Sequence, residues 1–255
     1  MKLKVAESHI NELLSMFYMG HTARTLQEQA QDAARNNLSH IEFLECILSQ
    51  EASLRHQRVV KDRLTRAHLP VLKTIDTFDW AHPSAIPKQM VLNSLSLEFV
   101  DKKMNLILVG PSGVGKTHIA LTLAYAACQK EIRTLWTTAA DMLNTLTAAK
   151  ADNSLMETIK HYASPKLLVI DELGFLPMDK DGSDLFFQII SHRYEQGSVV
   201  LTTNRAFKDW GKIFNDNTVA AAVLDRLVHH SEVAKIEGAS YRVKNRKEQM
   251  PQAAE

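Results

Sequence analysis

Residues 110–117 constrain the fold of this chain more than any other stretch. They match Gly-x-x-x-x-Gly-Lys-Thr without a mismatch, between an apolar run at 105–109 and a helix-like segment at 117–128. In a strand–loop–helix setting, the glycines let backbone N–H groups surround phosphate oxygens, and the helix N-terminus adds partial positive charge. The sequence therefore predicts an α/β fold that binds a nucleoside triphosphate. The predicted nucleotide-binding residues are Gly110, Pro111, Ser112, Gly113, Val114, Gly115, Lys116, Thr117 and His118.

The chemistry expected of this loop requires a metal ion and an acidic partner. Lys116 is expected to reach the β- and γ-phosphates, and the Thr117 hydroxyl to ligate Mg²⁺. A second apolar run at 166–170 ends in Asp171 and Glu172. Continuous apolar character is typical of a parallel strand buried on both faces, and ligands gather where such strands end. Asp171 is therefore predicted to hold Mg²⁺ through water, and Glu172 to activate the attacking water.

A third apolar run, at 199–201, leads into Thr202, Thr203 and Asn204. If this strand lies beside the one that ends at Asp171, the Asn204 amide can touch the γ-phosphate or the attacking water. Each motif also has a purely structural interpretation. A Thr-Thr-Asn ending is common in turns, and an Asp-Glu pair can end a strand at the protein surface. The order of loop, acidic strand and polar-ended strand is that of an AAA+ ATPase core.

Composition limits the other classes of protein. The chain has 255 residues, 45% hydrophobic and 23% charged, which excludes global disorder and suits one α/β domain with a smaller appendage. No apolar run approaches the ~20 residues of a membrane span, and no signal peptide is recognisable. Two cysteines and scattered histidines indicate neither a disulfide framework nor a zinc site. We expect an intracellular protein without a membrane partner.

The predicted organisation is a helical N-terminal domain at 1–73, a linker at 74–84, an ATPase core at 85–248 and a flexible tail at 249–255. Ser39 and Glu42 form a capping-box pattern that opens a helix. Phe78 and Trp80 in the linker either flank the nucleotide base or pack on the core. The remaining helices are predicted at 4–19, 22–35, 139–150, 184–196 and 218–230, and the remaining strands at 134–137, 232–236 and 240–243, the last two as a hairpin.

The net charge of +1 gives no global attraction to nucleic acid, so DNA contacts must come from local patches. One patch lies at 54–73 and a second in the tail at 242–248. Each patch is either a solvated face or a set of phosphate contacts. The candidate DNA-binding residues of the first patch are Arg55, Arg58, Lys61, Arg63 and Arg66, and the basic residues of the second are Arg242, Lys244, Arg246 and Lys247.

With these motifs, the chain resembles the IstB-type helper ATPases of bacterial insertion sequences, which share their core with DnaC-type helicase loaders. The likeness covers nearly the whole chain. After Asn204, 51 residues remain, which fit two helices and a hairpin but not the helical lid of most AAA+ proteins. No second sensor arginine is therefore assigned. The stretches that carry the likeness are 110–117, 168–174, 202–204, 39–51, 63–67, 78–80, 224–227 and 240–242.

The resemblance implies a homo-oligomeric, Mg²⁺-dependent ATPase in which a neighbouring subunit completes each site. Arg226 matches the arginine finger of this branch, with Arg193 as the alternative. Such a protein is expected to assemble on double-stranded DNA with ATP, deform it, and deliver it to the transposase of the same insertion sequence, with hydrolysis controlling disassembly. It would work in the cytoplasm, at the nucleoid when on DNA. A helicase loader, a non-catalytic nucleotide-gated scaffold and a small-molecule phosphotransferase are the competing interpretations.

Overall fold

The computed structural model describes residues 2–244, and of residues 2–7 the backbone alone. The chain divides into two compact units, Met1–Lys61 and Asp62–Glu255. The division lies inside the helix α3 (His40–Ala67), whose last turns belong to the second unit. There, Arg63 Nε donates to the Glu131 carbonyl at 2.9 Å. The predicted linker at 74–84 also belongs to this unit, where its Phe78 is buried. The predicted tail at 249–255, together with Arg246 and Lys247, lies outside the described residues.

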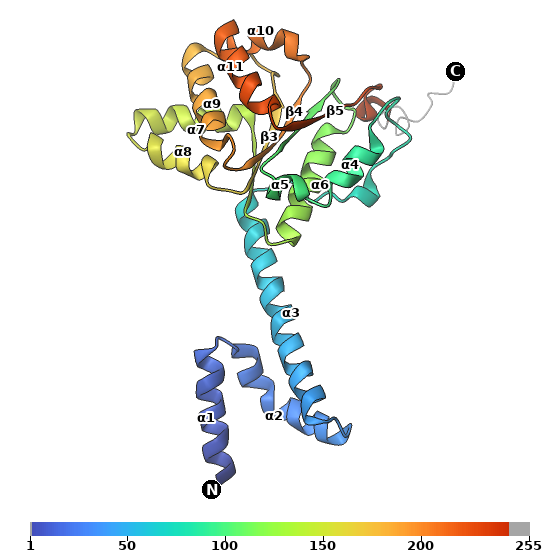
Figure 1. Ribbon diagram of the computed structural model, residues 1–255, viewed down its shortest axis with the longest axis vertical. Coiled ribbons are helices and arrows are strands. Elements are labelled where there is room, and N and C mark those ends of the chain that lie inside the picture. The colour runs from blue at the N-terminus through green and yellow to red at the C-terminus, as the bar shows by residue number, and fades with distance from the viewer. Residues whose placement is uncertain (1, 245–255) are drawn as a thin grey trace, which may run out of the picture. The chain divides into compact units, whose positions relative to one another are not determined.

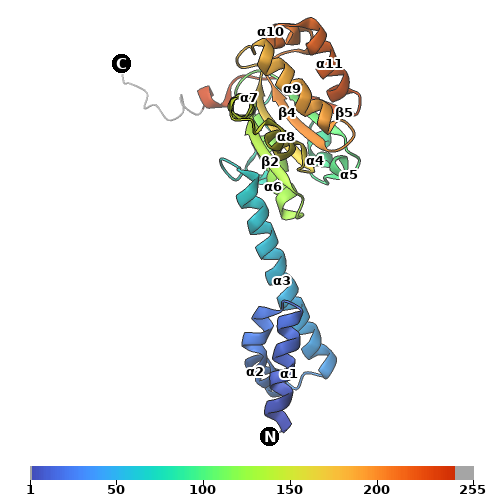
Figure 2. The same cartoon turned by 90° about the vertical axis from the view of Figure 1, so that its left-hand side faces the viewer.

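The first unit consists of α1 (Lys2–Met16), α2 (Gly20–Arg35) and the N-terminal part of α3. α1 packs beside α2 (Figure 2), and the start of α2 contacts α3 through Thr22. The predicted capping box is present, because the Glu42 carboxylate accepts the Ser39 N–H at 2.7 Å and Ser39 Oγ accepts the Glu42 N–H at 3.3 Å. The buried Glu51 carboxylate of α3 accepts both the N–H and the hydroxyl of Thr22, at 3.0 and 2.9 Å, which fixes the start of α2 against α3.

The second unit is built on a parallel sheet with the strand order β2-β3-β4-β1-β5. Side chains alternate along the strands, so that Leu106 and Leu108 enter one core and Ile107 the other. The strands are β1 (Asn105–Val109), β2 (Thr134–Thr138), β3 (Leu167–Leu173), β4 (Ser198–Thr203) and β5 (Ser231–Lys235).

Helices cover both faces of this sheet (Figure 1). On one face lie α4 (Lys88–Ser94), α5 (Glu98–Asp101) and α6 (Lys116–Gln129). On the other face lie α7 (Ala139–Ala151), α8 (Leu155–Ala163), α9 (Lys180–Arg193), α10 (Trp210–Phe214) and α11 (Asn217–Val228). Two short 3₁₀ helices, η1 (Ile75–Thr77) and η2 (Phe207–Asp209), complete the elements.

The predicted AAA+ type core is confirmed, because the strands that carry the loop, the Asp-Glu pair and the Thr-Thr-Asn ending are neighbours in one parallel sheet. Within residues 205–244, α10 and α11 pack against the sheet rather than forming a separate lid. The sequence did not predict α4, α5, α8 or α10. In the described residues 2–244, no helix combines the length and apolar composition that a bilayer-spanning segment needs.

The predicted C-terminal hairpin is wrong. β5 pairs in parallel with β1, and residues 241–244 are helical rather than extended. Gly238, at φ +147°, turns the chain after β5, and the Tyr241 N–H then donates to the Gly113 carbonyl at 2.9 Å. A contact between residues so distant in sequence overrides the strand propensity of a Tyr-Arg-Val stretch.

Arg193 is a structural residue at the end of α9. It is 1% exposed, and burial lowers the pKa of its guanidinium to about 10. A guanidinium held in this way inside its own unit does not reach a neighbouring subunit, which removes the support for Arg193 as the alternative finger. Its five hydrogen bonds go to the backbone carbonyls of Tyr162, Ala163, Pro165, Lys166 and Ser198.

Arg193→Ala should therefore lower the free energy of unfolding by about 3–5 kcal/mol, because it leaves several buried carbonyls without a donor. Urea unfolding followed by circular dichroism measures the change. The control is His192→Ala, at the exposed neighbouring position, which should stay within about 0.5 kcal/mol of the parent. Equal unfolding midpoints for Arg193→Ala and the parent would contradict this account.

Candidate nucleotide site

The phosphate-binding loop joins β1 to α6. Gly113 and Gly115 have φ values of +83° and +100°, which side chains other than glycine rarely adopt. A Cβ atom at Gly115 would lie 2.6 Å from the Phe78 ring, and one at Gly113 would lie 2.2 Å from Ser240 Oγ. The loop is thus enclosed by two segments that are remote in sequence, and its glycines are required by both conformation and space.

Lys116 begins α6 and is 8% exposed. Its Nζ donates to the carbonyls of Gly110 at 2.7 Å and Pro111 at 2.6 Å, so that the ammonium lies over the loop. Burial lowers the pKa of Lys116, the nearby Asp171 carboxylate raises it, and Arg242 lowers it further. Phosphate oxygens are stronger acceptors for an ammonium than neutral carbonyls, so a nucleotide can draw Nζ away from them.

Asp171 connects the loop to the neighbouring strands. Its side chain is 2% exposed, and Oδ1 accepts hydrogen bonds from Thr117 Oγ1 at 3.0 Å and Thr202 Oγ1 at 2.5 Å. A hydroxyl and a carboxylate side by side are the hard oxygen ligands that Mg²⁺ prefers beside nucleotide phosphates. The donor set fits Mg²⁺, which Thr117 and Asp171 would hold.

Glu172 lies at a β-bulge. The β3–β4 register shifts after Ile170, which pairs with Leu201, so that Asp171 and Glu172 together oppose Thr202. Glu172 has φ +63°, and its N–H donates to Thr202 Oγ1 at 2.9 Å. A bulge of this kind redirects a side chain out of the normal alternation. It leaves Asp171 buried and Glu172 exposed at the rim of a cavity.

The loop and the strand ends border a cavity of about 470 Å³, a size usual for ligand pockets. Lys116, Thr117, Glu172 and Asn204 line it, and so the structure brings these predicted residues together. The cavity is also lined by Val71, Lys73, Thr77, Phe78, Asp79, His82, Pro83, Ser112, Gly113, Val114, Gly115, His118, Leu121, Phe175, Thr202, Thr203, Tyr241 and Arg242.

The two aromatic residues of the predicted linker have different positions. Phe78 lines the cavity and makes edge contacts with Trp80 and His118, at ring-centroid separations of 4.8 and 5.3 Å. Trp80 is not among the described lining residues and packs against the core. Of the two, Phe78 is thus the one positioned to contact a nucleotide.

Arg242 lines this cavity, whereas the sequence placed it in a basic patch considered for DNA phosphate contacts and not at the nucleotide site. Its guanidinium donates to Ser112 Oγ in the loop at 2.8 Å, and its neighbour Tyr241 is hydrogen-bonded to Gly113. The wrongly predicted strand at 240–243 hid this arrangement. The signal available in the sequence was the Ser-Tyr-Arg stretch at 240–242. The helical segment after β5 thus brings a cation to the loop.

Arg226 in α11 does not belong to the described residues that line the cavity. Its Nη1 donates to the Ala222 carbonyl at 3.0 Å, and its guanidinium carbon lies 4.7 Å from the centre of the Phe187 ring.

The basic residues of α3 lie outside the cavity as well. Three of them donate hydrogen bonds within their own unit: Arg55 to the Phe17 carbonyl, Arg63 to the Glu131 carbonyl and Arg66 to the Asp62 carboxylate.

A family model described as IstB-like ATP binding protein matches residues 13–249. The chain belongs to this family. Among curated relatives of this IstB-like chain, the insertion sequence IS21 putative ATP-binding protein of Pseudomonas aeruginosa is 39% identical over 92% of this chain and 89% of that protein. The corresponding IS232 protein of Bacillus thuringiensis subsp. berliner is 37% identical over 95% of this chain and 97% of that protein.

Solved structures support the fold. The DnaC helicase loader matches 64% of this IstB-like chain and 96% of its own, with a TM-score of 0.52 and 22% identity. AMPPCP-bound DnaA from Aquifex aeolicus matches 71% of this chain and 56% of its own, with a TM-score of 0.57 and 21% identity. At these identities, the likeness shows the fold alone, which is the parallel sheet with helices on both faces.

Thr202 supplies a test of the geometry around the bulge, because its hydroxyl bonds both to Asp171 and to the Glu172 N–H. Thr202→Val keeps the shape of the side chain but removes both bonds. It should lower the ATP hydrolysis rate about 10–100-fold while ATP binding persists. Phosphate release and binding of a fluorescent ATP analogue measure the two quantities.

The control for this test is Lys116→Ala, which should lose binding itself because the ammonium that meets the phosphates is gone. An unchanged hydrolysis rate in Thr202→Val would contradict a positioning role for Thr202. Full ATP affinity in Lys116→Ala would contradict the assignment of the loop.

Proposed function

We propose that this IstB-like protein is an Mg²⁺-dependent ATPase that assembles on double-stranded DNA with ATP, deforms the DNA and delivers it to the transposase of the same insertion sequence. The observation that carries the hydrolytic part is the bulge at the end of β3, which exposes Glu172 beside the phosphate-binding loop. The names of the relatives, which are insertion sequence ATP-binding proteins, support the setting in transposition. The proposed place of action is the cytoplasm, at the nucleoid when the protein is on DNA.

In the proposed reaction, the Glu172 carboxylate accepts a proton from the attacking water, and the Asn204 amide orients that water or the γ-phosphate. Lys116 exchanges its loop carbonyls for phosphate oxygens. Arg242, whose guanidinium donates to Ser112 Oγ in the loop, is expected to exchange this partner for phosphate oxygens in the same way. Mg²⁺ held by Thr117 and Asp171 would neutralise charge that develops on the phosphates.

We propose that Arg226 of a neighbouring subunit completes each site as an arginine finger. This role fits its position on α11, outside the cavity of its own chain. A guanidinium at the γ-phosphate contributes about 10³–10⁵ in rate in related phosphoryl-transfer sites. Because the γ-phosphate would then contact two subunits, hydrolysis removes a contact that favours the assembled state, and ATP controls disassembly.

The first unit is proposed to make contacts between proteins. Several large apolar side chains of α1, α3 and the turns between the helices are exposed, which is typical of surfaces that another protein covers. The partner is a second subunit or the transposase. These side chains are Ile10, Leu13, Met16, Phe17, Tyr18, Leu38, Ile41, Leu44 and Leu48.

DNA contact is proposed for the basic side of α3. Arg55, Arg58, Lys61 and Arg66 are exposed, and phosphate contacts from such residues require no base reading. The deformability of the duplex would then set the preference for a target.

Sedimentation of the Glu172→Gln variant with duplex DNA tests the proposed function directly. With ATP, the variant should hydrolyse about 10²–10⁴-fold more slowly than the parent, because the general base is lost. It should also remain in a large complex with duplex DNA, whereas the parent complex decays as ATP is consumed. ADP should support neither complex.

The Lys116→Ala variant is the control, which should form no ATP-dependent complex. Assembly on single-stranded DNA alone, or assembly that requires a replicative helicase, would contradict the proposal and favour a helicase loader. A parent-like hydrolysis rate in Glu172→Gln would remove Glu172 as the base.

A further inference from the structure

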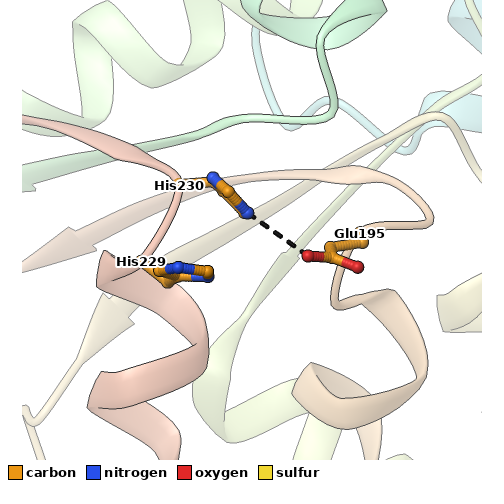
Figure 3. A group of neighbouring side chains, drawn as sticks. All are labelled: Glu195, His229 and His230. Atoms are coloured by element: carbon orange, nitrogen blue, oxygen red, sulfur yellow. Dashed lines mark hydrogen bonds and ion pairs between the residues drawn. The ribbon is translucent and has the colours of Figure 1, made fainter.

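Three side chains with metal-binding groups lie together at the end of the sheet remote from the loop. Glu195 follows α9 and precedes β4, whereas His229 and His230 lie between α11 and β5. One ligand atom from each residue lies within 4.8 Å of the other two. Figure 3 shows the His230 ring directed at the Glu195 carboxylate, with the His229 ring beside it. Because β4 and β5 begin here, the cluster and the nucleotide cavity are at opposite strand ends.

The contacts within this His229–His230–Glu195 cluster give each group a defined place. His230 Nε2 lies 3.3 Å from Glu195 Oε1, and the two imidazole centroids are 4.0 Å apart. The Tyr194 hydroxyl is hydrogen-bonded to His229 Nδ1 at 2.7 Å. A hydrogen bond on one ring nitrogen of a ligating histidine fixes the ring and leaves the other nitrogen for the metal. For His229, that nitrogen is Nε2.

We propose that Glu195, His229 and His230 bind a divalent transition-metal ion of the zinc class. Two imidazoles and a carboxylate are a common three-residue set for Zn²⁺, with water in the open position, whereas Mg²⁺ and Ca²⁺ select oxygen ligands. Zinc bonds of about 2.0–2.1 Å require ligand atoms nearer than 4.8 Å. The side chains of His230 and Glu195 are 45% and 56% exposed, so small rotations about their own bonds can bring them in.

The bound ion would join the ends of two helices that carry part of the proposed machinery. Glu195 is attached to the end of α9, and His229 follows α11 directly. The two helices already pack together, and Arg226, one turn before His229, stacks on Phe187 of α9. The ion would therefore hold the C-terminal end of α11 against α9. The existence of the site does not depend on the proposed function.

Isothermal titration calorimetry with zinc chloride tests this site. The full chain is first treated with EDTA and dialysed. The parent should show one saturable site per chain. His229→Gln, His230→Gln and Glu195→Gln should each weaken the binding by about tenfold or more, and Tyr194→Phe should weaken it without removing a ligand. His40→Gln, at an exposed histidine of the first unit, is the matched control and should bind zinc as the parent does.

Hydrogen exchange gives a second readout. Zinc should slow exchange in the last turn of α11 and around 194–198 in the parent, and should have no effect there in the His229→Gln/His230→Gln double variant. Because the replaced side chains are exposed, the variants should fold as the parent does. Equal zinc affinity in the parent and the double variant, or saturable zinc binding without protection at α11, would overturn the proposal.

Discussion

The buried carboxylate of Asp171 is the interaction on which the rest of the nucleotide site depends. A charged group that is 2% exposed is costly unless hydrogen bonds satisfy it, and Thr117 and Thr202 both donate to its Oδ1. Through these two bonds, the start of α6, the end of β3 and the end of β4 are held at one point. The same Thr202 hydroxyl accepts the Glu172 N–H, so the position of the proposed base follows from the position of the proposed magnesium ligand.

Within the described residues 2–244, two segments of the core border the site, and no separate lid is present. The segment after β5 brings Tyr241 and Arg242 against the phosphate-binding loop. Phe78, in the segment after α3, lies against Gly115 of the same loop. Both segments are short and belong to the same unit as the sheet. Within one subunit, they supply an aromatic wall and a cation. The site nevertheless lacks a finger from its own α11, and this is the physical reason to expect a neighbour to complete it.

Much of this arrangement could be predicted from the sequence, because each part rests on a local signal. The loop is marked by its glycines, and β1, β3 and β4 are continuous apolar runs with polar ends. Because the strands of a parallel sheet end at the same edge, the sequence also predicted that these polar ends lie close together. Tertiary contacts hid the rest. The extended-looking stretch at 240–243 is helical because Tyr241 bonds to Gly113, and Arg193 gives no sign in the sequence that carbonyls surround it. The bulge at Glu172 depends on register, which a single strand does not encode.

The central claim is that ATP is hydrolysed between subunits, with Glu172 from one and Arg226 from the next. The most direct measurement mixes two inactive variants, Glu172→Gln and Arg226→Ala, on duplex DNA with ATP and follows phosphate release. In an equal random mixture, about a quarter of the interfaces pair an intact Glu172 with an intact Arg226, if subunits join head to tail. The account predicts that activity returns to about that fraction of the parent value. Co-assembly of the two variants without any recovery would contradict it.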